Sequence, residues 1–379
     1  MKKLLLAILL FIGLLGAFIL LASDILVKPG ERDMKIIGPV NQTVQLDYNR
    51  DIPIRTFADE PVSESENYIA LNVMTYNIAY GYGWGSEGPG YKHRDWDLYE
   101  RRLKEMAALI DHFDVDILLI QEIDFKSSRS ADVDQLKFLL EHTGLKYGAY
   151  APSWTAGYVP FPFGSIRNQF GRVNSGGAVL SRYPISSNKV TLLPKPDSNP
   201  WWYNAFYLYR YSQWVDIELP EIIQEDTGNT NKVTFVNHHL EAFDIPNKEE
   251  HADIVLGMVS DRINDPSKPS PVIFGGDINS VPAQAQKKSN FVDSDDDYED
   301  DYSLDRYYNF PGYRELISLE DYYRSEYQYY TFPAHMPDRR LDYLFVRDDI
   351  PFNNVKFLLT GELSDHIPVM SSIYIPKAP

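Results

Sequence analysis

The sequence predicts an α/β protein in which two packed β-sheets are flanked by helices, preceded by one apolar N-terminal helix. Two observations lead to this fold class: short apolar runs outnumber the helical patterns between them, and residues 4–22 carry no charge. Hydrophobic residues make up 44% of the 379 positions and aromatic residues 14%, which excludes global disorder. Many strands with few helices between them favour two packed sheets over a regularly alternating parallel sheet.

The N-terminal run LLLAILLFIGLLGAFILLA, residues 4–22, follows Lys2 and Lys3. A cleaved signal peptide has an apolar core of about 7–15 residues, whereas about 20 apolar residues span a bilayer. We favour an uncleaved signal anchor; a cleaved signal would instead release a secreted protein. The basic end should stay cytoplasmic and place residues 30–379 outside. Three basic residues on the far flank weaken that orientation: Lys28, Arg32 and Lys35.

The chain divides most simply into an anchor at 1–23, a stalk or linker at 24–66 and one globular domain, large enough for an enzyme, at 67–379. Residues 24–66 are polar and contain several prolines, with room for an edge strand. No internal repeat and no second linker interrupts the remainder.

Within the domain, apolar residues three and four apart predict a helix whose buried face includes Leu103, Met106 and Ile110. A second helix is predicted within 132–144, ending before Gly144. Eight apolar runs predict strands at 69–77, 116–122, 176–181, 212–219, 232–240, 271–277, 341–346 and 367–375.

Composition limits the chemistry that is possible. Cysteine is absent, which excludes disulfides, thiolate zinc sites and a cysteine nucleophile. Any metal must bind oxygen and imidazole ligands, which favours Mg²⁺ or Mn²⁺. The net charge of −18 argues against broad capture of nucleic acid. Part of that charge lies in FVDSDDDYEDDYSLD (291–305), which we interpret as a solvated surface insert, with a calcium loop as the alternative.

Polar side chains stand at the ends of six predicted strands. A single Asp at a strand end is ordinarily a turn or a cap. Six strand ends that all offer oxygen or imidazole donors instead predict a metal-hydrolase cluster where the ends meet. The residues are Asn77, Gln121, Glu122, His238, His239, Asp277, Asn279, Asp342, Asp365 and His366.

Six motifs in this order resemble the endonuclease/exonuclease/phosphatase superfamily: NVMTYNI, LIQEID, VNHHL, GGDIN, LDYLFV and SDHIPV. GGAVLSRYPI (176–185) resembles a further strand of that family. The superfamily includes pancreatic-type deoxyribonucleases, abasic-site endonucleases, inositol-polyphosphate 5-phosphatases and neutral sphingomyelinases. The resemblance covers about residues 70–375. It implies a four-layered α/β sandwich with the active site at one rim of the two sheets.

The resemblance also implies a metal site for Mg²⁺, with Mn²⁺ as an alternative. Glu122 is then the principal ligand, Asn77 lies beside it and Asp365 assists. The local alternative for Glu122 is a carboxylate that caps the following turn.

The remaining roles implied by the resemblance concern water and phosphate. Asp277 accepts the proton of the attacking water, and Asn279 orients water or phosphate. His366 lies over the phosphate, and Asp342 fixes its tautomer and charge. The local alternatives are an Asx turn at 277–279 and a Ser-Asp turn at 364–365 with a surface histidine.

The second histidine of the site is expected to be His239, which would donate to a phosphate oxygen. His238 stands where the family usually has Thr. Because neighbouring residues of a strand point to opposite faces, only one of the two can face the rim. Alignment to Leu240 selects His239.

Two aromatic-rich segments, 158–172 and 200–214, bear on the substrate. They either pack in the interior or form a wall beside the cleft that contacts lipid, with Trp201 and Trp202 as candidates for interfacial contact. Three arginines are candidates to supply the positive charge that the acidic body lacks: Arg167, Arg172 and Arg182.

Three functions remain open from the sequence. The first is a membrane-tethered phosphoesterase for a lipid headgroup or other small phosphoester, and the second is an anchored or secreted nuclease. The third is an inactive binding module, which the intact motifs disfavour. No obligate protein partner is indicated.

Overall fold

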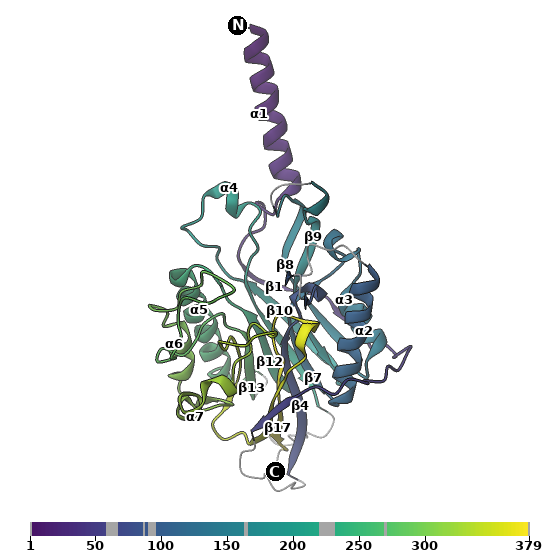
Figure 1. The fold of residues 1–379 in the computed structure, drawn as a ribbon, viewed down its shortest axis with the longest axis vertical. Coiled ribbons are helices and arrows are strands. Elements are labelled where there is room, and N and C mark those ends of the chain that lie inside the picture. Colours follow the sequence, from purple (N-terminus) through teal and green to yellow (C-terminus); the bar gives the residue numbers. More distant parts are fainter. Residues whose placement is uncertain are drawn as a thin grey trace.

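The computed structural model describes residues 2–57, 67–85, 88–89, 96–162, 166–219, 232–268 and 271–377. Two mixed β-sheets pack face to face, and helices cover the outer face of each sheet (Figure 1). This four-layered α/β sandwich confirms the predicted fold class.

The first sheet has one parallel pair, β12 with β13, and is otherwise antiparallel. In order across the sheet, its strands are β1 (Gly30–Asp33), β10 (Ile185–Leu192), β11 (Tyr211–Glu218), β12 (Lys232–His239), β13 (Val272–Asp277), β15 (Asp342–Arg347) and β14 (Tyr313–Glu315).

The second sheet also has one parallel pair, β4 with β7. In order, its strands are β2 (Ile36–Ile37), β8 (Tyr147–Val159), β9 (Gly171–Ser181), β7 (Ile117–Asp124), β4 (Tyr68–Asn77), β17 (Val369–Pro376), β16 (Phe352–Leu358) and β3 (Ile54–Phe57). A separate small ribbon pairs β5 (Trp84–Gly85) with β6 (Gly88–Pro89).

The central strands are buried on both faces, which explains their continuous apolar sequences. In β4 and β7, Val73 and Leu119 face the opposite sheet, while Met74 and Ile120 face the outer helices. This alternation follows from the two-residue period of a strand. The core between the sheets therefore fixes which residues can reach the rim where β4 and β7 end.

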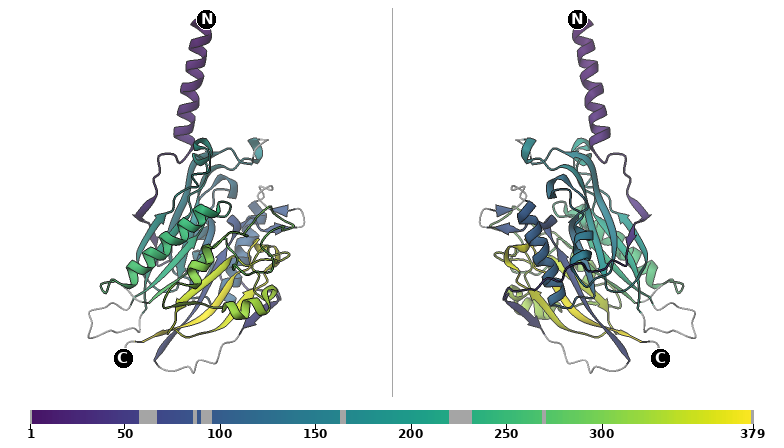
Figure 2. Two further views of the ribbon diagram at one scale, coloured as in Figure 1. Left: turned by 90° about the vertical axis from the view of Figure 1, so that its left-hand side faces the viewer. Right: turned by 90° about the vertical axis from the view of Figure 1, so that its right-hand side faces the viewer.

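Four of the described helices lie on the two outer faces, as the side views show (Figure 2). Helices α2 and α3 cover the second sheet, and α5 and α6 cover the first. The helices are α1 (Lys2–Ala22), α2 (Trp96–His112), α3 (Gln135–His142), α4 (Trp201–Asn204), α5 (Ile245–Ile263), α6 (Ser303–Tyr308) and α7 (Leu319–Arg324). Short 3₁₀ turns are η1 (Ala79–Gly81), η3 (Ser128–Ser130), η4 (Ile166–Asn168), η5 (Glu326–Gln328) and η6 (Gly361–Leu363).

All eight strands predicted from apolar runs are present, and α2 and α3 correspond to the two predicted helices. Asp134 caps α3 by accepting from the backbone N–H of Lys137. The sequence reasoning missed β8, β10, β16 and helix α5. Strand β8 contains Pro152 and glycines with two register shifts, and β10 is largely polar, so neither has a continuous apolar run.

Most of the described part of the segment expected to be a stalk lies against the domain. It adds edge strands β1, β2 and β3 to the two sheets, where one edge strand was expected. Immediately after α1, Lys195 binds Asp24 at 2.8 Å, and the Tyr209 hydroxyl donates to the carbonyl of Val27 at 2.8 Å. These contacts join the end of α1 directly to the domain.

The acidic stretch 291–305 is not the solvated insert that its charge predicts. Phe291, Tyr298 and Asp301 are buried. Arg339, itself buried, donates to the carboxylates of Asp293 and Asp296. The pairing with one buried cation and the two aromatic side chains hold this stretch on the domain.

Helix α1 extends away from the body of the molecule (Figure 1). Lys3–Ala22 has a mean hydropathy of 3.1 and is exposed except in its last turn, which is the length and composition of a membrane span or a signal sequence. Its last turn contacts the domain: Phe18 lies 6.3 Å, centroid to centroid, from both Tyr158 and Phe206. The N-terminus therefore indicates a membrane or secretory route.

Candidate active site

The predicted site residues meet at one rim because of how the strands run. Strands β4 and β7 are parallel neighbours in one sheet, and β12 and β13 are parallel neighbours in the other, so each pair ends at one edge. The register places His239 opposite Asp277, and Asp277 opposite Asp342. A hydrogen bond of 3.0 Å from Asn77 to Asp277 joins the two sheets at this edge.

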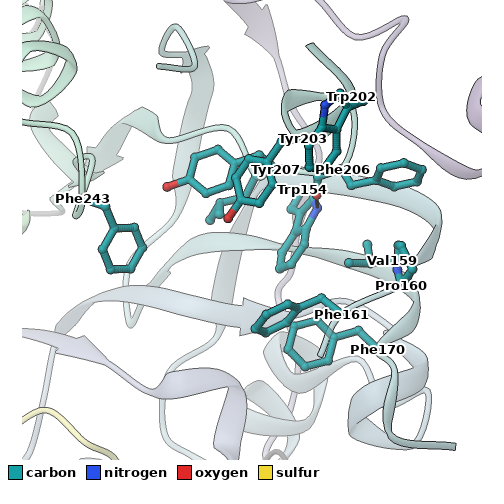
Figure 3. Close-up of a pocket in the computed structure, with 11 residues that line it drawn as sticks. Trp154, Val159, Pro160, Phe161, Phe170, Trp202, Tyr203, Phe206, Tyr207 and Phe243 are labelled. Carbon is teal, nitrogen blue, oxygen red and sulfur yellow. Dashed lines mark hydrogen bonds between the residues drawn. The ribbon is translucent and has the colours of Figure 1, made fainter. Parts of the chain in front are cut away.

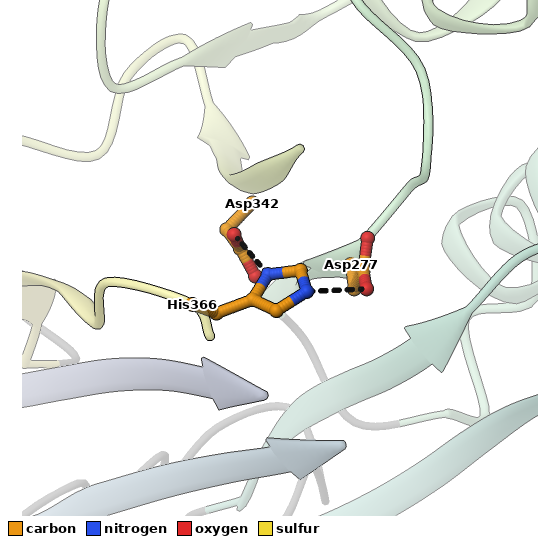
Figure 4. A group of neighbouring side chains, drawn as sticks. All are labelled: Asp277, Asp342 and His366. Atoms are coloured by element: carbon orange, nitrogen blue, oxygen red, sulfur yellow. Dashed lines mark hydrogen bonds and ion pairs between the residues drawn. The ribbon is translucent and has the colours of Figure 1, made fainter. Parts of the chain in front are cut away.

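Asp277, Asp342 and His366 form the centre of the cluster (Figure 4). Nδ1 of His366 lies 2.9 Å from Oδ2 of Asp342, and Nε2 lies 3.7 Å from Oδ2 of Asp277. All three side chains are buried, and each offers an atom within 4.8 Å of the others. The imidazole is thus held between two carboxylates, and Phe332 packs beside it at 4.7 Å between ring centroids.

The charge of His366 follows from these neighbours. Burial alone would lower its pKa, but the carboxylates of Asp342 and Asp277 and the hydrogen bond to Asp342 raise the pKa to about 10. His366 is therefore an imidazolium at neutral pH, with Nδ1–H donated to Asp342. Since both nitrogens of an imidazolium carry protons, Nε2 is a donor toward the cleft.

His239 differs from His366 in charge and in partners. Nη1 of Arg210 lies 2.6 Å from its Nε2, which lies 3.4 Å from Asp277 and 3.9 Å from Glu122. Burial and then the positive charge of Arg210 lower the pKa of His239 well below its usual value, so the ring is neutral. His238 points to the opposite face and packs on Tyr307 at 5.5 Å between ring centroids. His239 therefore faces the rim, while His238 faces the outer helices.

Two site residues adopt the left-handed backbone conformation that non-glycine residues rarely use. Glu122 and Asn279 both have φ near 55°. Between Ile120 and Ile123 the pairing of β7 with β9 shifts register, and this irregularity turns Glu122 toward the rim. Backbone conformations of this kind cost about 1–3 kcal/mol and concentrate at functional sites.

The local turns expected as alternatives are also present. One carboxylate oxygen of Asp277 accepts from the backbone N–H of Asn279 at 3.0 Å, which is an Asx turn. Ser364 donates to the carbonyl of Asn77 at 2.7 Å and accepts from the N–H of His366 at 3.2 Å. The turns leave Oδ2 of Asp277 and the His366 ring directed at one another. They position the site and do not compete with it.

The donor set fits a hard divalent cation. Partial burial and the charge of Asp365 raise the pKa of Glu122 to about 7, and burial raises the pKa of Asp277 to about 6. The pKa of Asp365 is raised as well, chiefly by burial. These shifts reflect several carboxylates crowded at one rim, and a divalent cation bound by oxygen ligands would relieve that crowding. Glu122, Asn77 and Asp365 would hold it, with Asp277 adjacent.

Sequence reasoning missed the main cation of the site. Arg210 immediately precedes β11 and is buried, with Nε 3.6 Å from Glu241 and Nη1 on His239. A charged residue at a strand end is the same signal that identified the carboxylates. Lys248, also missed, is buried and donates to the backbone carbonyl of Asn279 and to Asp301. It supports the loop that carries Asn279.

Two of the arginines sought as site cations have other partners. Arg182 lies at the opposite end of β7 from Glu122 and pairs with Asp114 and Asp116. Arg172 pairs with Asp132 at an exposed position. The arginine at the site is Arg210 instead, and it adds its positive charge to that of the His366 imidazolium.

A family model described as the Endonuclease/Exonuclease/phosphatase family matches residues 74–366, which contain the whole rim cluster. The chain belongs to this family. The resemblance seen in the six motifs is thereby confirmed, while the roles of the individual residues remain predictions.

Solved structures of the family share the fold at low identity. The endonuclease/exonuclease/phosphatase from Beutenbergia cavernae DSM 12333 is 18% identical with a TM-score of 0.54, over 82% of this chain and 72% of that chain. A mannosyl-6-phosphatase from Bacteroides thetaiotaomicron VPI-5482 is 18% identical with a TM-score of 0.51, over 80% and 99%. The catalytic domain of human Nocturnin with bound sulfate is 16% identical with a TM-score of 0.51, over 81% and 96%. A search of curated proteins finds no match.

Proposed function

We propose that this protein is a membrane-tethered, Mg²⁺-dependent phosphoesterase that hydrolyses a lipid headgroup or another small phosphoester. The observation that carries the proposal is the buried imidazolium of His366 held between Asp342 and Asp277 at the carboxylate-rich rim. Nε2 of His366 and Oδ2 of Asp277 lie 3.7 Å apart, which supports a proton donor and a proton acceptor acting side by side on a phosphate and its attacking water.

The residues have complementary roles in the proposed reaction. Oδ2 of Asp277 aligns the attacking water and accepts its proton. Nε2–H of His366 donates to a non-bridging phosphate oxygen as negative charge develops, and Asp342 keeps Nδ1 protonated. Arg210 adds a positive charge beside the neutral His239. The divalent cation, held by Glu122 with Asn77 and Asp365, would supply electrostatic stabilisation of the phosphate and acidify the water.

The tether and the charge support a membrane substrate over nucleic acid. Helix α1 has the length and composition of an uncleaved anchor, which would place the domain on the extracytoplasmic side. The chain carries a net charge of −18, which repels a polyanion at physiological salt. The mannosyl-6-phosphatase of the same fold is named for a small phosphomonoester. We therefore expect a lipid or small phosphoester to be the better substrate.

The test uses the full-length protein in lipid nanodiscs with Mg²⁺. Three substrates are compared: a bis-aryl phosphodiester, phospholipid and sphingomyelin vesicles, and plasmid DNA. We expect turnover of an ester or lipid that stops when a chelator is added and returns with excess Mg²⁺. Robust cleavage of DNA without turnover of any lipid or small ester would instead identify a nuclease. Activity that is indifferent to chelator would contradict the metal assignment.

A further inference from the structure

An aromatic pocket of about 360 Å³ opens around α4, and one of its lining residues, Phe206, lies against the last turn of α1. Its walls come from two segments, the second half of β8 with the connection to β9 and the loop around α4, with Phe243 at one end (Figure 3). Most of the lining residues belong to the aromatic-rich segments 158–172 and 200–214, for which the sequence allowed either interior packing or a wall beside the cleft. They do the latter in part: Trp202, Phe161 and Phe243 line the pocket and are 52%, 45% and 75% exposed.

The pocket surface is apolar because its polar atoms are turned away. The indole N–H of Trp154 donates to the carbonyl of Phe206 at 3.1 Å, and the hydroxyl of Tyr207 donates to Glu241 at 2.6 Å. With those groups satisfied inside the protein, the walls offer aromatic and aliphatic surface to an occupant. A sugar or a nucleobase would need hydrogen-bond partners there, whereas a hydrocarbon chain needs none.

Two chains of contacts connect the pocket to the catalytic rim. On one wall, Tyr207 binds Glu241, which lies 3.6 Å from Arg210, which contacts His239. The pocket thus shares one ion pair with the site. Glu241 and Arg210 are thus the two side chains that lie between the pocket wall at Tyr207 and His239.

On the other wall, the guanidinium of Arg129 lies 5.1 Å from the ring of Trp154 and 4.8 Å from that of Phe170. The same guanidinium lies 3.6 Å from the ring of Tyr80. Arg129 also donates to Asp124 of β7 at 2.9 Å, and Asp124 lies two residues after the proposed metal ligand Glu122. Both walls therefore lead to the catalytic rim within a few residues.

The opposite end of the pocket faces the root of α1. Phe206, which lines the pocket, lies 6.3 Å from Phe18 in the last turn of that helix. Trp201 and Trp202 project from α4 at 65% and 52% exposure on the same side. If α1 spans a bilayer, this face lies at the lipid interface, where Trp and Tyr side chains are favoured.

We propose that this pocket is a substrate subsite that holds the hydrocarbon chain of a membrane lipid while its phosphoester lies at Asp277 and His366. The inference rests on the proposed phosphoesterase function and specifies its substrate as a lipid phosphoester with at least one long chain. The chain passes from the bilayer into the pocket, and the headgroup reaches the rim past the walls that Tyr207 and Trp154 line, with Glu241 and Arg129 in contact behind them.

The test uses water-soluble aryl alkyl phosphodiesters below their micelle concentration, with alkyl chains of two to eight carbons. Full-length protein in detergent micelles of fixed composition is assayed with Mg²⁺, and kcat/KM is measured for each ester. Wild-type kcat/KM should rise by up to about fourfold per methylene as each is transferred from water into the pocket. A flat dependence on chain length, with the two-carbon ester hydrolysed, would overturn the subsite and leave the proposed function intact.

The variants exploit two adjacent tryptophans. Trp202→Ser with Phe243→Ser removes two pocket-lining rings, and because both are exposed the fold should survive. This variant should keep wild-type kcat/KM on the two-carbon ester. Its ratio of kcat/KM for the eight-carbon ester to that for the two-carbon ester should be about tenfold or more below the wild-type ratio. Trp201→Ser is the matched control: Trp201 is in the same helix and more exposed, but it does not line the pocket.

The outcomes separate the pocket from its alternatives. Both variants are also assayed on phospholipid vesicles. If Trp201→Ser and the pocket variant lose activity equally on vesicles, and neither loses activity on the soluble esters, the aromatic residues insert into the bilayer and no chain enters the pocket. Failure of the wild type to hydrolyse even the two-carbon ester would contradict the proposed function itself. Loss on the two-carbon ester by the pocket variant alone, at unchanged Tm, would assign the pocket to the leaving group and overturn the chain subsite.

Discussion

At the scale of single residues, the site separates two histidines by charge. His366 lies between carboxylates and is held as an imidazolium, while His239 lies against Arg210 and is held neutral. The same ring can therefore act as a donor in one position and as an acceptor or neutral donor in the other. The difference comes from the neighbours, because both rings are buried to a similar extent.

Asp342→Asn tests the charge of His366. With Asp342 neutral, the largest contribution that raises the pKa of His366 is lost, so the imidazolium deprotonates at a lower pH. We expect kcat/KM near neutrality to fall about 10²-fold or more and the alkaline limb of its pH profile to move to lower pH. Measurement of kcat/KM from pH 6 to 10 checks this, and an unchanged alkaline limb would contradict the charge assignment.

The same pair predicts a pH dependence of stability. The folded pKa of His366, about 10, exceeds its unfolded value, so folding takes up a proton here. Its contribution is fully present below about pH 6.5 and is lost as pH rises toward 10. Urea unfolding of the wild type should show this loss, and Asp342→Asn should reduce it. The difference between the two proteins isolates the pair from other groups that titrate in the range.

Glu122→Ala tests the metal ligand. The folded pKa of Glu122, about 7, lies above its unfolded value, so ionisation at pH 8 costs stability in the metal-free protein. Removal of the carboxylate should therefore leave Tm unchanged or higher without metal and abolish the rise in Tm caused by Mg²⁺. Metal-dependent turnover should fall about 10³-fold. Retention of full activity, or of the Mg²⁺-induced rise in Tm, would show that Glu122 is not the ligand.

At the scale of elements, the end of β13 shows how closely the catalytic strand is packed. A Cβ on Gly276 would lie 2.0 Å from the carbonyl oxygen of His238, and one on Gly275 would lie 2.1 Å from that of Tyr343. Gly276 also has φ of 140°, which side-chain-bearing residues rarely adopt. These two glycines let β13 approach both of its neighbours, so that Asp277 emerges between His239 and Asp342.

Gly276→Ala should consequently destabilise the fold by about 2–4 kcal/mol in the free energy of unfolding, because the backbone of β12 must move. Urea denaturation measures this. Gly257→Ala is the control, since Gly257 is exposed in the middle of α5 and nothing lies within 4 Å of the added Cβ. It should stabilise by about 0.5–1 kcal/mol. Equal effects of the two substitutions would contradict the packing at β13.

At the scale of the whole molecule, the aromatic residues around α4 lie between helix α1 and the catalytic rim and are in contact with both. Helix α1 joins the domain through Phe18 and through the Asp24–Lys195 pair, with no long free linker between them. The domain is therefore held close to a membrane that α1 would span. Short tethers of this kind raise the effective concentration of a substrate in that membrane.

Deletion of residues 2–22 tests the tether and keeps the Asp24 contacts. Turnover of vesicle lipid should fall about 10²-fold or more, whereas kcat/KM on a soluble short-chain ester should stay within about twofold. Cleavage of plasmid DNA should remain slower than that of the ester at physiological salt for both proteins. An equal fall on vesicles and on the soluble ester would show that α1 acts through the fold and not through proximity.

The sequence alone determined the two-sheet class, eight strands, two helices and the composition of the rim cluster. These features depend on local patterns: continuous apolar runs mark strands buried on both faces, and a polar residue at the end of such a run marks the rim. Glu122, Asp277 and His366 were found in this way. The length and composition of the apolar N-terminal run likewise indicate a membrane or secretory route.

Only the tertiary structure decided the features that depend on distant partners. Strand β8 and helix α5 have weak local patterns and are ordered by their neighbours, as is the acidic stretch that Arg339 holds. The role of Arg210, and the meeting of two aromatic segments in one pocket, depend on side chains brought together from separate strands and loops. A residue's own sequence context records its periodicity and its flanks, whereas its partner across a sheet or a loop is set by the packing of the whole chain.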